Sequence, residues 1–146
     1  MAEVNGPMTS DVMARAMQTN PVVIRRIMAG LRDAGFVSSA KGHGGGWTIA
    51  RDLTAITLRD VYSALGSPEL FAMGNRTEAP GCLVEQAINA ALNSALEDAE
   101  ALLLDRFAGV TLGQLSADFH ARMVAGGIFL EPDSKANYRA SRLTPN

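Results

Sequence analysis

The segment from Lys41 to Trp47 contains a histidine followed by three glycines. A histidine with glycines also occurs in the oxyanion hole of lipase and esterase folds, where backbone N–H groups bind a developing negative charge. Three consecutive glycines also let the main chain come close to another molecule, because no side chain blocks the approach. The segment therefore fits either a catalytic loop or a backbone that lies against a binding partner.

A catalytic loop of the esterase kind needs a nucleophile, and the sequence offers none at the required spacing. The α/β-hydrolase fold presents its serine in a G-x-S-x-G elbow within a long alternation of strands and helices. The segment Gly66-Ser67-Pro68 lacks both the spacing and the second glycine, and the chain has only 146 residues. We therefore predict that the protein is not an enzyme, and turnover of a nitrophenyl ester would contradict this.

Two short helices are expected before the glycine segment. The first can begin at Thr9 or Ser10, whose hydroxyl oxygens suit the N-cap position. The second begins at Asn20-Pro21, an N-cap residue followed by proline in the first helical position, and ends at Gly35. Two short helices joined by a turn of three residues form a helix-turn-helix.

A hairpin is expected to follow the two helices. Segments 36–39 and 47–50 have the residue types of short strands on either side of the glycines. Helix, turn, helix and hairpin is the order of elements in a winged helix, so the glycine segment is predicted to form the tip of the wing. The expected fold is mainly α with a small β-hairpin.

The second half of the sequence is dominated by one long helix. After a short helix that begins at Thr54 or Thr57 and ends at Gly66, and an irregular loop at 67–82, helical periodicity runs from Leu83 to about Phe107. Its apolar residues recur three and four positions apart: Val84, Ile88, Ala91, Leu92, Ala95, Leu96, Ala99, Leu102 and Leu103. A stripe of this length exceeds what a small winged helix can cover, so we expect a partner subunit to bury it.

These elements predict four parts of the chain. A winged helix-turn-helix occupies 1–66, a loop 67–82, and dimerisation helices 83–126, the last of which begins at Thr111. Residues 127–146 mix Pro, Ser, Asn and charged side chains, which favours a mobile tail.

Charge also differs between the first 51 residues and the rest of the chain. Residues 1–51 contain six Arg or Lys and three Asp or Glu, whereas the remainder contains seven basic and twelve acidic residues. A basic segment favours an anionic partner. The single cysteine, Cys82, permits no intrachain disulfide, which fits a reducing cytoplasm. No apolar run approaches the roughly 18 residues needed to span a bilayer.

The segments LRDAGFVSSAKGHGGGWTIAR and ITLRDVYSALG resemble the Rrf2 family of bacterial winged-helix transcription regulators. The family run is a leucine, Ala-Gly, a hydrophobic pair, a basic residue, G-x-G-G-G and an aromatic residue. It is matched by Leu31, Ala34, Gly35, Phe36, Val37, Lys41, Gly42, Gly44, Gly45, Gly46 and Trp47. The resemblance covers about Met8 to Met123. It implies a transcriptional regulator, of the repressor type, that binds a palindromic double-stranded DNA operator as a homodimer.

The sequence departs from the family pattern at two places. Members normally open with a longer first helix under the helix-turn-helix, whereas only MAEVNGP precedes the first helix expected here. A winged-helix module that contacts proteins instead of DNA is therefore the alternative function. The iron-sulfur members carry three cysteines before the long helix, and only Cys82 matches one of them. Because a cluster needs about four ligands, we predict no cluster and no other cofactor or metal.

The second helix and the wing carry the candidate DNA-binding residues. The N-terminal turn of a recognition helix faces the bases, where valines suit thymine methyl groups and arginines reach guanine edges or phosphates. The small wing tip can lie against the minor groove. The candidates are Asn20, Val22, Val23, Arg25, Arg26, Lys41, His43, Gly44 and Gly45. The alternatives are exposed arginines that only meet solvent and a plain hairpin turn, and Trp47 is expected in the core.

Cys82 directly precedes the long helix. Free backbone N–H groups and the helix dipole at such a position favour the thiolate. This placement is compatible with a redox sensor that uses one cysteine. The alternative is a small apolar residue without chemical function.

Overall fold

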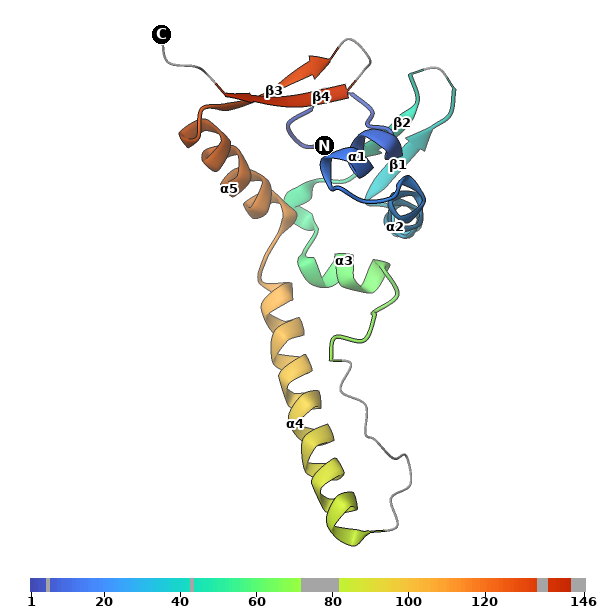
Figure 1. Ribbon diagram of the computed structural model, residues 1–146, viewed down its shortest axis with the longest axis vertical. Coiled ribbons are helices and arrows are strands. Elements are labelled where there is room, and N and C mark those ends of the chain that lie inside the picture. Colours follow the sequence, from blue (N-terminus) through green and yellow to red (C-terminus); the bar gives the residue numbers. More distant parts are fainter. Residues whose placement is uncertain (5, 43, 72–81, 134–136, 143–146) are drawn as a thin grey trace.

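The computed structural model describes residues 1–4, 6–42, 44–71, 82–133 and 137–142. The first helices and the first hairpin lie together, and one long helix projects away from them (Figure 1). In chain order the elements are α1 (Ser10–Ala16), α2 (Pro21–Asp33), β1 (Val37–Ala40), β2 (Gly46–Ile49), the 3-10 turn η1 (Leu53–Ala55), α3 (Leu58–Ala64), α4 (Leu83–Ala108), α5 (Leu112–Ala125), β3 (Ile128–Asp133) and β4 (Asn137–Arg142).

The helix-turn-helix is formed by α1 and α2, whose starts are fixed by local hydrogen bonds. The Thr9 hydroxyl oxygen accepts from the Val12 N–H at 3.3 Å, and the Asn20 amide oxygen accepts from the Val22 N–H at 2.8 Å. Each bond satisfies a backbone donor that the helix itself leaves unpaired. Gly35 follows α2 with a φ of +77°, a conformation that glycine adopts without strain.

The core lies between the two helices and the hairpin. Ile24 and Met28, one turn apart on α2, turn inward and are only 3% and 6% exposed. They pack with apolar residues from the N-terminal segment, α1 and β1. The buried cluster consists of Val4, Met8, Val12, Met13, Ala14, Ile24, Met28 and Val37. Burial of this cluster fixes the rotation of α2 about its axis, and with it the side chains that α2 presents to solvent.

The hairpin of β1 and β2 is attached to α1 through the tryptophan. In the antiparallel register, Ser39 is opposite Trp47. Trp47 also exchanges two backbone hydrogen bonds of 2.9 Å with Met8, and its indole N–H donates to the Ser10 hydroxyl at 3.0 Å. The Trp47 ring packs against the core, as predicted, and holds the wing to the helix-turn-helix.

The helix α3 starts at Thr57, one of two threonines that the sequence offered. The Thr57 hydroxyl accepts from the Asp60 N–H at 3.1 Å, and the Asp60 carboxylate accepts from the Thr57 N–H at 2.8 Å. The Thr57 hydroxyl, which donates to the Asp60 carboxylate at 2.7 Å, and the Thr57 N–H both lower the pKa of Asp60. The second threonine, Thr54, lies in the 3-10 turn η1.

Two backbone hydrogen bonds join the start of α3 to the start of α5. The Leu58 N–H donates to the Val110 carbonyl at 2.9 Å, and the Leu112 N–H donates to the Ile56 carbonyl at 2.8 Å. Because α4 ends at Gly109, these bonds also fix the end of α4 next to the winged helix. The other end of α4 lies far from it (Figure 1).

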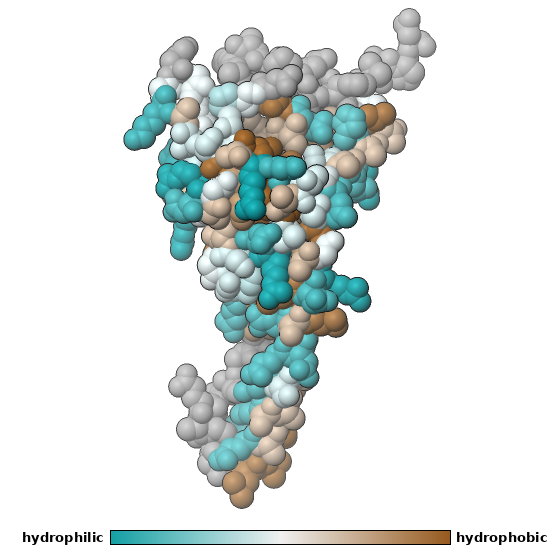
Figure 2. Space-filling model, turned by 180° about the vertical axis from the view of Figure 1, so that it is seen from behind, coloured by the Kyte–Doolittle hydropathy of each residue, from teal (hydrophilic) through white to brown (hydrophobic). Residues whose placement is uncertain are grey.

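The long helix α4 has no buried residue along its 26 positions. Apolar surface is visible at the far end of the projecting helix (Figure 2). Its most exposed large apolar residues are Leu83, Val84, Ile88, Leu92 and Leu102. These include four members of the predicted stripe, and no described part of the chain buries them. None of the helices in the described ranges is long and apolar enough to cross a membrane.

The C-terminal region contains two strands within the segment predicted as a mobile tail. Strands β3 and β4 pair antiparallel, with Ile128 opposite Arg142 and Asp133 opposite Asn137. Pairing between two strands is not visible in the composition of either one. The proline within β3, Pro132, is tolerated because a hairpin of two strands leaves one edge of each strand unpaired. The sequence did not predict this hairpin, and the mobility of 127–146 stays a prediction.

Candidate nucleic-acid interface

The outward face of α2 carries the candidate residues of the recognition helix. Val22 and Arg26 are four positions apart and share a face, about 200° around the helix from the buried Ile24 and Met28. Val22 is 63% exposed and Val23 is 47% exposed. The first turn of α2 contains no acidic side chain, so its positive end is not neutralised by the helix itself.

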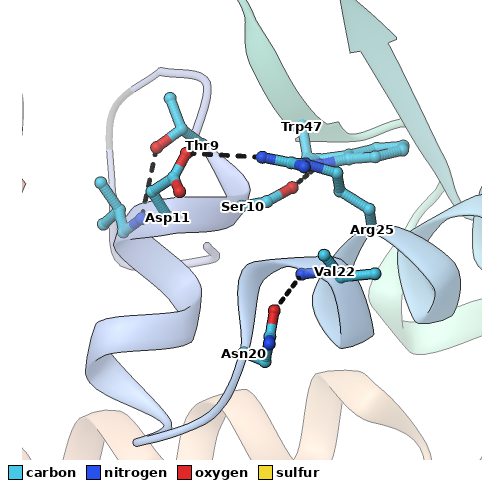
Figure 3. A network of polar contacts seen from close by, with 8 residues as sticks. Thr9, Ser10, Asp11, Asn20, Val22, Arg25 and Trp47 are labelled. Atoms are coloured by element: carbon cyan, nitrogen blue, oxygen red, sulfur yellow. Dashed lines mark hydrogen bonds and ion pairs between the residues drawn. The ribbon is translucent and has the colours of Figure 1, made fainter.

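The two candidate arginines of this helix, Arg25 and Arg26, differ in their partners. A guanidinium nitrogen of Arg25 lies 3.9 Å from a carboxylate oxygen of Asp11 on α1, and both side chains are more than half exposed. The Arg25 side chain extends from α2 toward Asp11 across the start of α1 (Figure 3). Such an exposed pair is weak and can be exchanged for a phosphate. Arg26 is also exposed, and within the described ranges its side chain has no ion pair or hydrogen bond.

Asn20 is the N-cap residue of α2 and lies two positions before the exposed Val22 (Figure 3). Its side-chain oxygen is engaged by the Val22 N–H at 2.8 Å. Its amide NH₂ group stays available as a hydrogen-bond donor. Asn20 therefore stabilises the first helical turn and presents a donor beside it.

The wing tip is compact because its backbone requires glycine. Gly44 has a φ of +80°, and the Gly45 N–H donates to the Gly42 carbonyl at 3.0 Å. A Cβ atom on Gly45 would clash with the Ala40 carbonyl oxygen. The exposed side chain of Lys41 stands at the start of this turn. The tip thus offers bare backbone with a cation beside it, while the candidate His43 lies outside the described residues.

The structure brings the candidate residues onto two elements that share one core. Asn20, Val22, Val23, Arg25 and Arg26 lie on the first half of α2, whereas Lys41, Gly44 and Gly45 lie at the wing tip. The Phe36 N–H donates to the Leu31 carbonyl at 2.9 Å, which joins the end of α2 to the hairpin.

Sequence reasoning missed the polar contacts between elements. Asp11 approaches Arg25 from 14 positions away. The Tyr62 hydroxyl of α3 donates to the Pro68 carbonyl at 2.9 Å and to the Glu100 carboxylate of α4 at 3.4 Å. Desolvation and the Glu100 carboxylate raise the pKa of Tyr62. No local pattern marks such pairs, because each depends on how distant segments pack.

Cys82 occupies the N-cap position of α4 and is exposed. The backbone N–H groups of Glu85 and Val84 lower the pKa of its thiol. The predicted position at a helix start is confirmed, whereas a sensing role stays a prediction.

An iron-sulfur cluster does not fit the residues that the structure describes. Cys82 is the only cysteine of the chain. Across the described ranges, no group of three or more His, Cys, Asp or Glu side chains is placed to hold a metal ion. The expected absence of a cluster stays a prediction, which iron analysis of the purified protein tests.

Relatives of this chain are described as transcriptional regulators. A Bacillus subtilis protein named as the HTH-type regulator YwnA is 31% identical over 105 residues, which cover 71% of this chain and 77% of that protein. A Lactococcus lactis protein named as the HTH-type regulator YffB is 28% identical over 114 residues, which cover 77% of this chain and 73% of that protein.

Solved structures share the fold. A Lactobacillus plantarum protein described as a transcriptional regulator matches with a TM-score of 0.66 at 21% identity, over 82% of both chains. The T. potens IscR structure matches with a TM-score of 0.54 at 19% identity, over 77% of this chain and 71% of that one. The predicted winged-helix fold is confirmed by these likenesses.

The family model described as "Rrf2: Iron-dependent Transcriptional regulator" matches residues 1–118. This match includes the helix-turn-helix, the glycine wing, α3, α4 and the start of α5. The chain therefore belongs to the Rrf2 family of transcriptional regulators and is not an enzyme.

Proposed function

We propose that this protein is a DNA-binding repressor that binds a palindromic operator as a homodimer in the cytoplasm. The observation that carries the proposal is the exposed first half of α2, where Val22 and Arg26 share the face turned away from the core. An α-helix fits the major groove, and its N-terminal residues then meet the base edges.

The arginines supply the charge that DNA binding needs. Each cation that meets a phosphate releases a condensed counterion, which makes the affinity depend steeply on salt. Arg26 is free of competing partners within the described ranges, and the contact of Arg25 with Asp11 is long and exposed. We assign Arg26 to the base edges or the phosphates beside Val22, and Arg25 to the flanking phosphate backbone.

The wing is assigned to the minor groove. The positive φ at Gly44 and the close Ala40 carbonyl oxygen at Gly45 restrict these two positions to glycine, so the backbone there can approach DNA closely. Lys41 adds positive charge beside it, and His43 is proposed as a further hydrogen-bonding contact. Contacts of this kind position a protein on the duplex and favour a narrow minor groove.

A second copy of the chain is the proposed cover for α4. Leu83, Val84 and Ile88 are 78%, 66% and 53% exposed, which is unusual for adjacent apolar residues on a soluble helix. A two-fold axis would place the same stripe of each copy against the other and present two recognition helices to two half-sites. Operator occupancy by such a dimer is sufficient for repression.

A protein-interaction module is the second candidate. Met17, at the C-cap of α1, is 65% exposed, so both helices of the helix-turn-helix carry exposed large apolar side chains. An apolar surface of this kind also suits a protein partner. DNA binding decides between the two functions.

The decisive experiment is selection from random duplex DNA, followed by gel shifts at several salt concentrations. We expect a palindromic consensus, and a loss of affinity in Arg26→Ala. A base contact would cost about 1–3 kcal/mol and relax one position, whereas a phosphate contact would weaken all sequences alike. Arg122→Ala on α5 removes the same charge from an exposed ion pair with Asp118 and serves as the control. Failure to retain any DNA would favour the interaction module.

A further inference from the structure

The first turn of α2 exposes two valines that do not pack into the buried core cluster. Val22 and Val23 are 63% and 47% exposed, whereas Ile24, the next residue, is 3% exposed. Valine has a lower helix propensity than unbranched residues, so helix formation does not account for the two valines. Packing and helix propensity therefore both leave these two side chains unexplained.

Their surroundings define what they can meet. Val22 shares its face with Arg26, one turn further along. The oxygen of Asn20 is held by the Val22 N–H at 2.8 Å, so the Asn20 side chain is left with its NH₂ donor beside the valines. A surface of apolar side chains next to a cation fits a partner with apolar groups close to phosphates.

The major groove offers one apolar group on a base edge, the C5 methyl of thymine. An aliphatic side chain gains by removing that methyl from water. The same side chain placed against an amino group or a carbonyl oxygen of another base would leave a polar group without a partner.

We propose that α2 recognises thymine methyl groups, so that each operator half-site carries thymine at the positions opposite Val22 and Val23. This inference rests on the proposed function, since it requires α2 to lie in the major groove. Specificity at these positions then comes from the methyl group, while Arg26 supplies a hydrogen-bonded or phosphate contact beside them.

The test replaces thymine by uracil, which lacks only the C5 methyl. Each thymine of the selected operator is replaced singly by deoxyuridine, and the dissociation constant is measured at fixed salt. Loss of one buried methyl contact weakens binding by about fourfold. We expect this loss at one or two positions in each half-site and none at the remaining thymines. The protein is unchanged in this arm, so altered folding cannot produce the effect.

Protein variants then assign each position to its valine. We expect Val22→Ala to lose the preference for thymine over uracil at the base position opposite Val22. Val23→Ala should lose it at the position opposite Val23. Leu65→Ala, which shortens an exposed apolar side chain at the end of α3, keeps the fourfold discrimination.

The outcomes separate the inference from the proposed function. If no duplex is retained, the DNA-binding function is wrong and the inference is wrong with it. If DNA is retained but uracil is tolerated at every position, or the selected half-sites contain no thymine, the protein binds DNA and the methyl recognition alone is wrong. A preference for thymine over uracil that persists in both Val22→Ala and Val23→Ala also overturns the methyl recognition.

Discussion

At the scale of single residues, the interface depends on which charges are already paired. Arg25 lies 3.9 Å from Asp11, and Arg26 has no such neighbour among the described residues. In the proposed DNA complex, a phosphate would compete with the Asp11 carboxylate for Arg25. The carboxylate would also repel the DNA backbone.

Removing this competitor is expected to strengthen DNA binding. An exposed ion pair is worth about 0.2–1 kcal/mol, so Asp11→Asn should lower the dissociation constant about 1.4- to fivefold at low salt. Fluorescence anisotropy with a labelled operator measures the change. Asp118→Asn, which releases Arg122 on α5 in the same way, should have no effect. Unchanged or weaker DNA binding in Asp11→Asn would show that Arg25 does not contact the DNA.

The thiol of Cys82 is expected to react faster than an ordinary exposed cysteine. The backbone N–H groups at the start of α4 lower its pKa, so more thiolate is present at neutral pH. The rate of alkylation, followed against pH, should rise at a lower pH in the folded chain than in the same chain unfolded in urea. Identical pH profiles in the folded and the unfolded chain would show that the start of α4 does not lower the pKa of the Cys82 thiol.

The sensing role of this thiol has a separate readout. Peroxide oxidises a thiolate to a sulfenic acid, which adds a polar group at the N-cap of α4. Operator affinity should fall in the wild type after peroxide and stay constant in Cys82→Ser. An equal loss in both proteins would make Cys82 a bystander.

At the scale of elements, the wing depends on close contact between two backbones. A Cβ atom added to Gly46 would lie 2.8 Å from the Met8 carbonyl oxygen, beside the bridge between Met8 and Trp47. We expect Gly46→Ala to lower the free energy of unfolding by about 1–3 kcal/mol, as other forced insertions do. Urea unfolding measures it. Gly109→Ala is the control, because a Cβ atom there meets only an ordinary contact of 3.5 Å. Equal stabilities would mean that the bridge moves freely.

Elements with local signals were predictable from the sequence. Asn20 starts α2, Thr111 starts α5 and Gly109 ends α4 where the sequence indicates, because caps and glycine stops act over a few residues. The hairpin of β3 and β4 was not predicted, since its stability comes from pairing between segments. In the candidate site, the position of Val22 and Arg26 in the first turns of the second helix was predictable, but the sequence carried no information on the approach of Asp11 to Arg25.

At the scale of the whole molecule, the proposed dimer places apolar side chains of α4 in a dry interface. Leu92 lies within the predicted stripe and is 49% exposed in the single chain. A charge there would lose its hydration on dimer formation without gaining a partner, which costs several kcal/mol. We expect Leu92→Asp to be monomeric by light scattering and to retain its helical circular dichroism. Asn93→Asp adds a charge at the next, exposed position and should stay dimeric. A dimeric Leu92→Asp protein would place the interface elsewhere.

The projecting helix also has a mechanical consequence. With 26 residues, α4 is about 39 Å long. It is joined to the winged helix in its last third, through the Tyr62 hydroxyl and Glu100. The start of the helix lies about 25 Å from Glu100, so a tilt of about 5° at that joint displaces the start by about 2 Å. The helix therefore acts as a lever, which converts a small change of angle beside Tyr62 into a displacement of the helix start at Cys82.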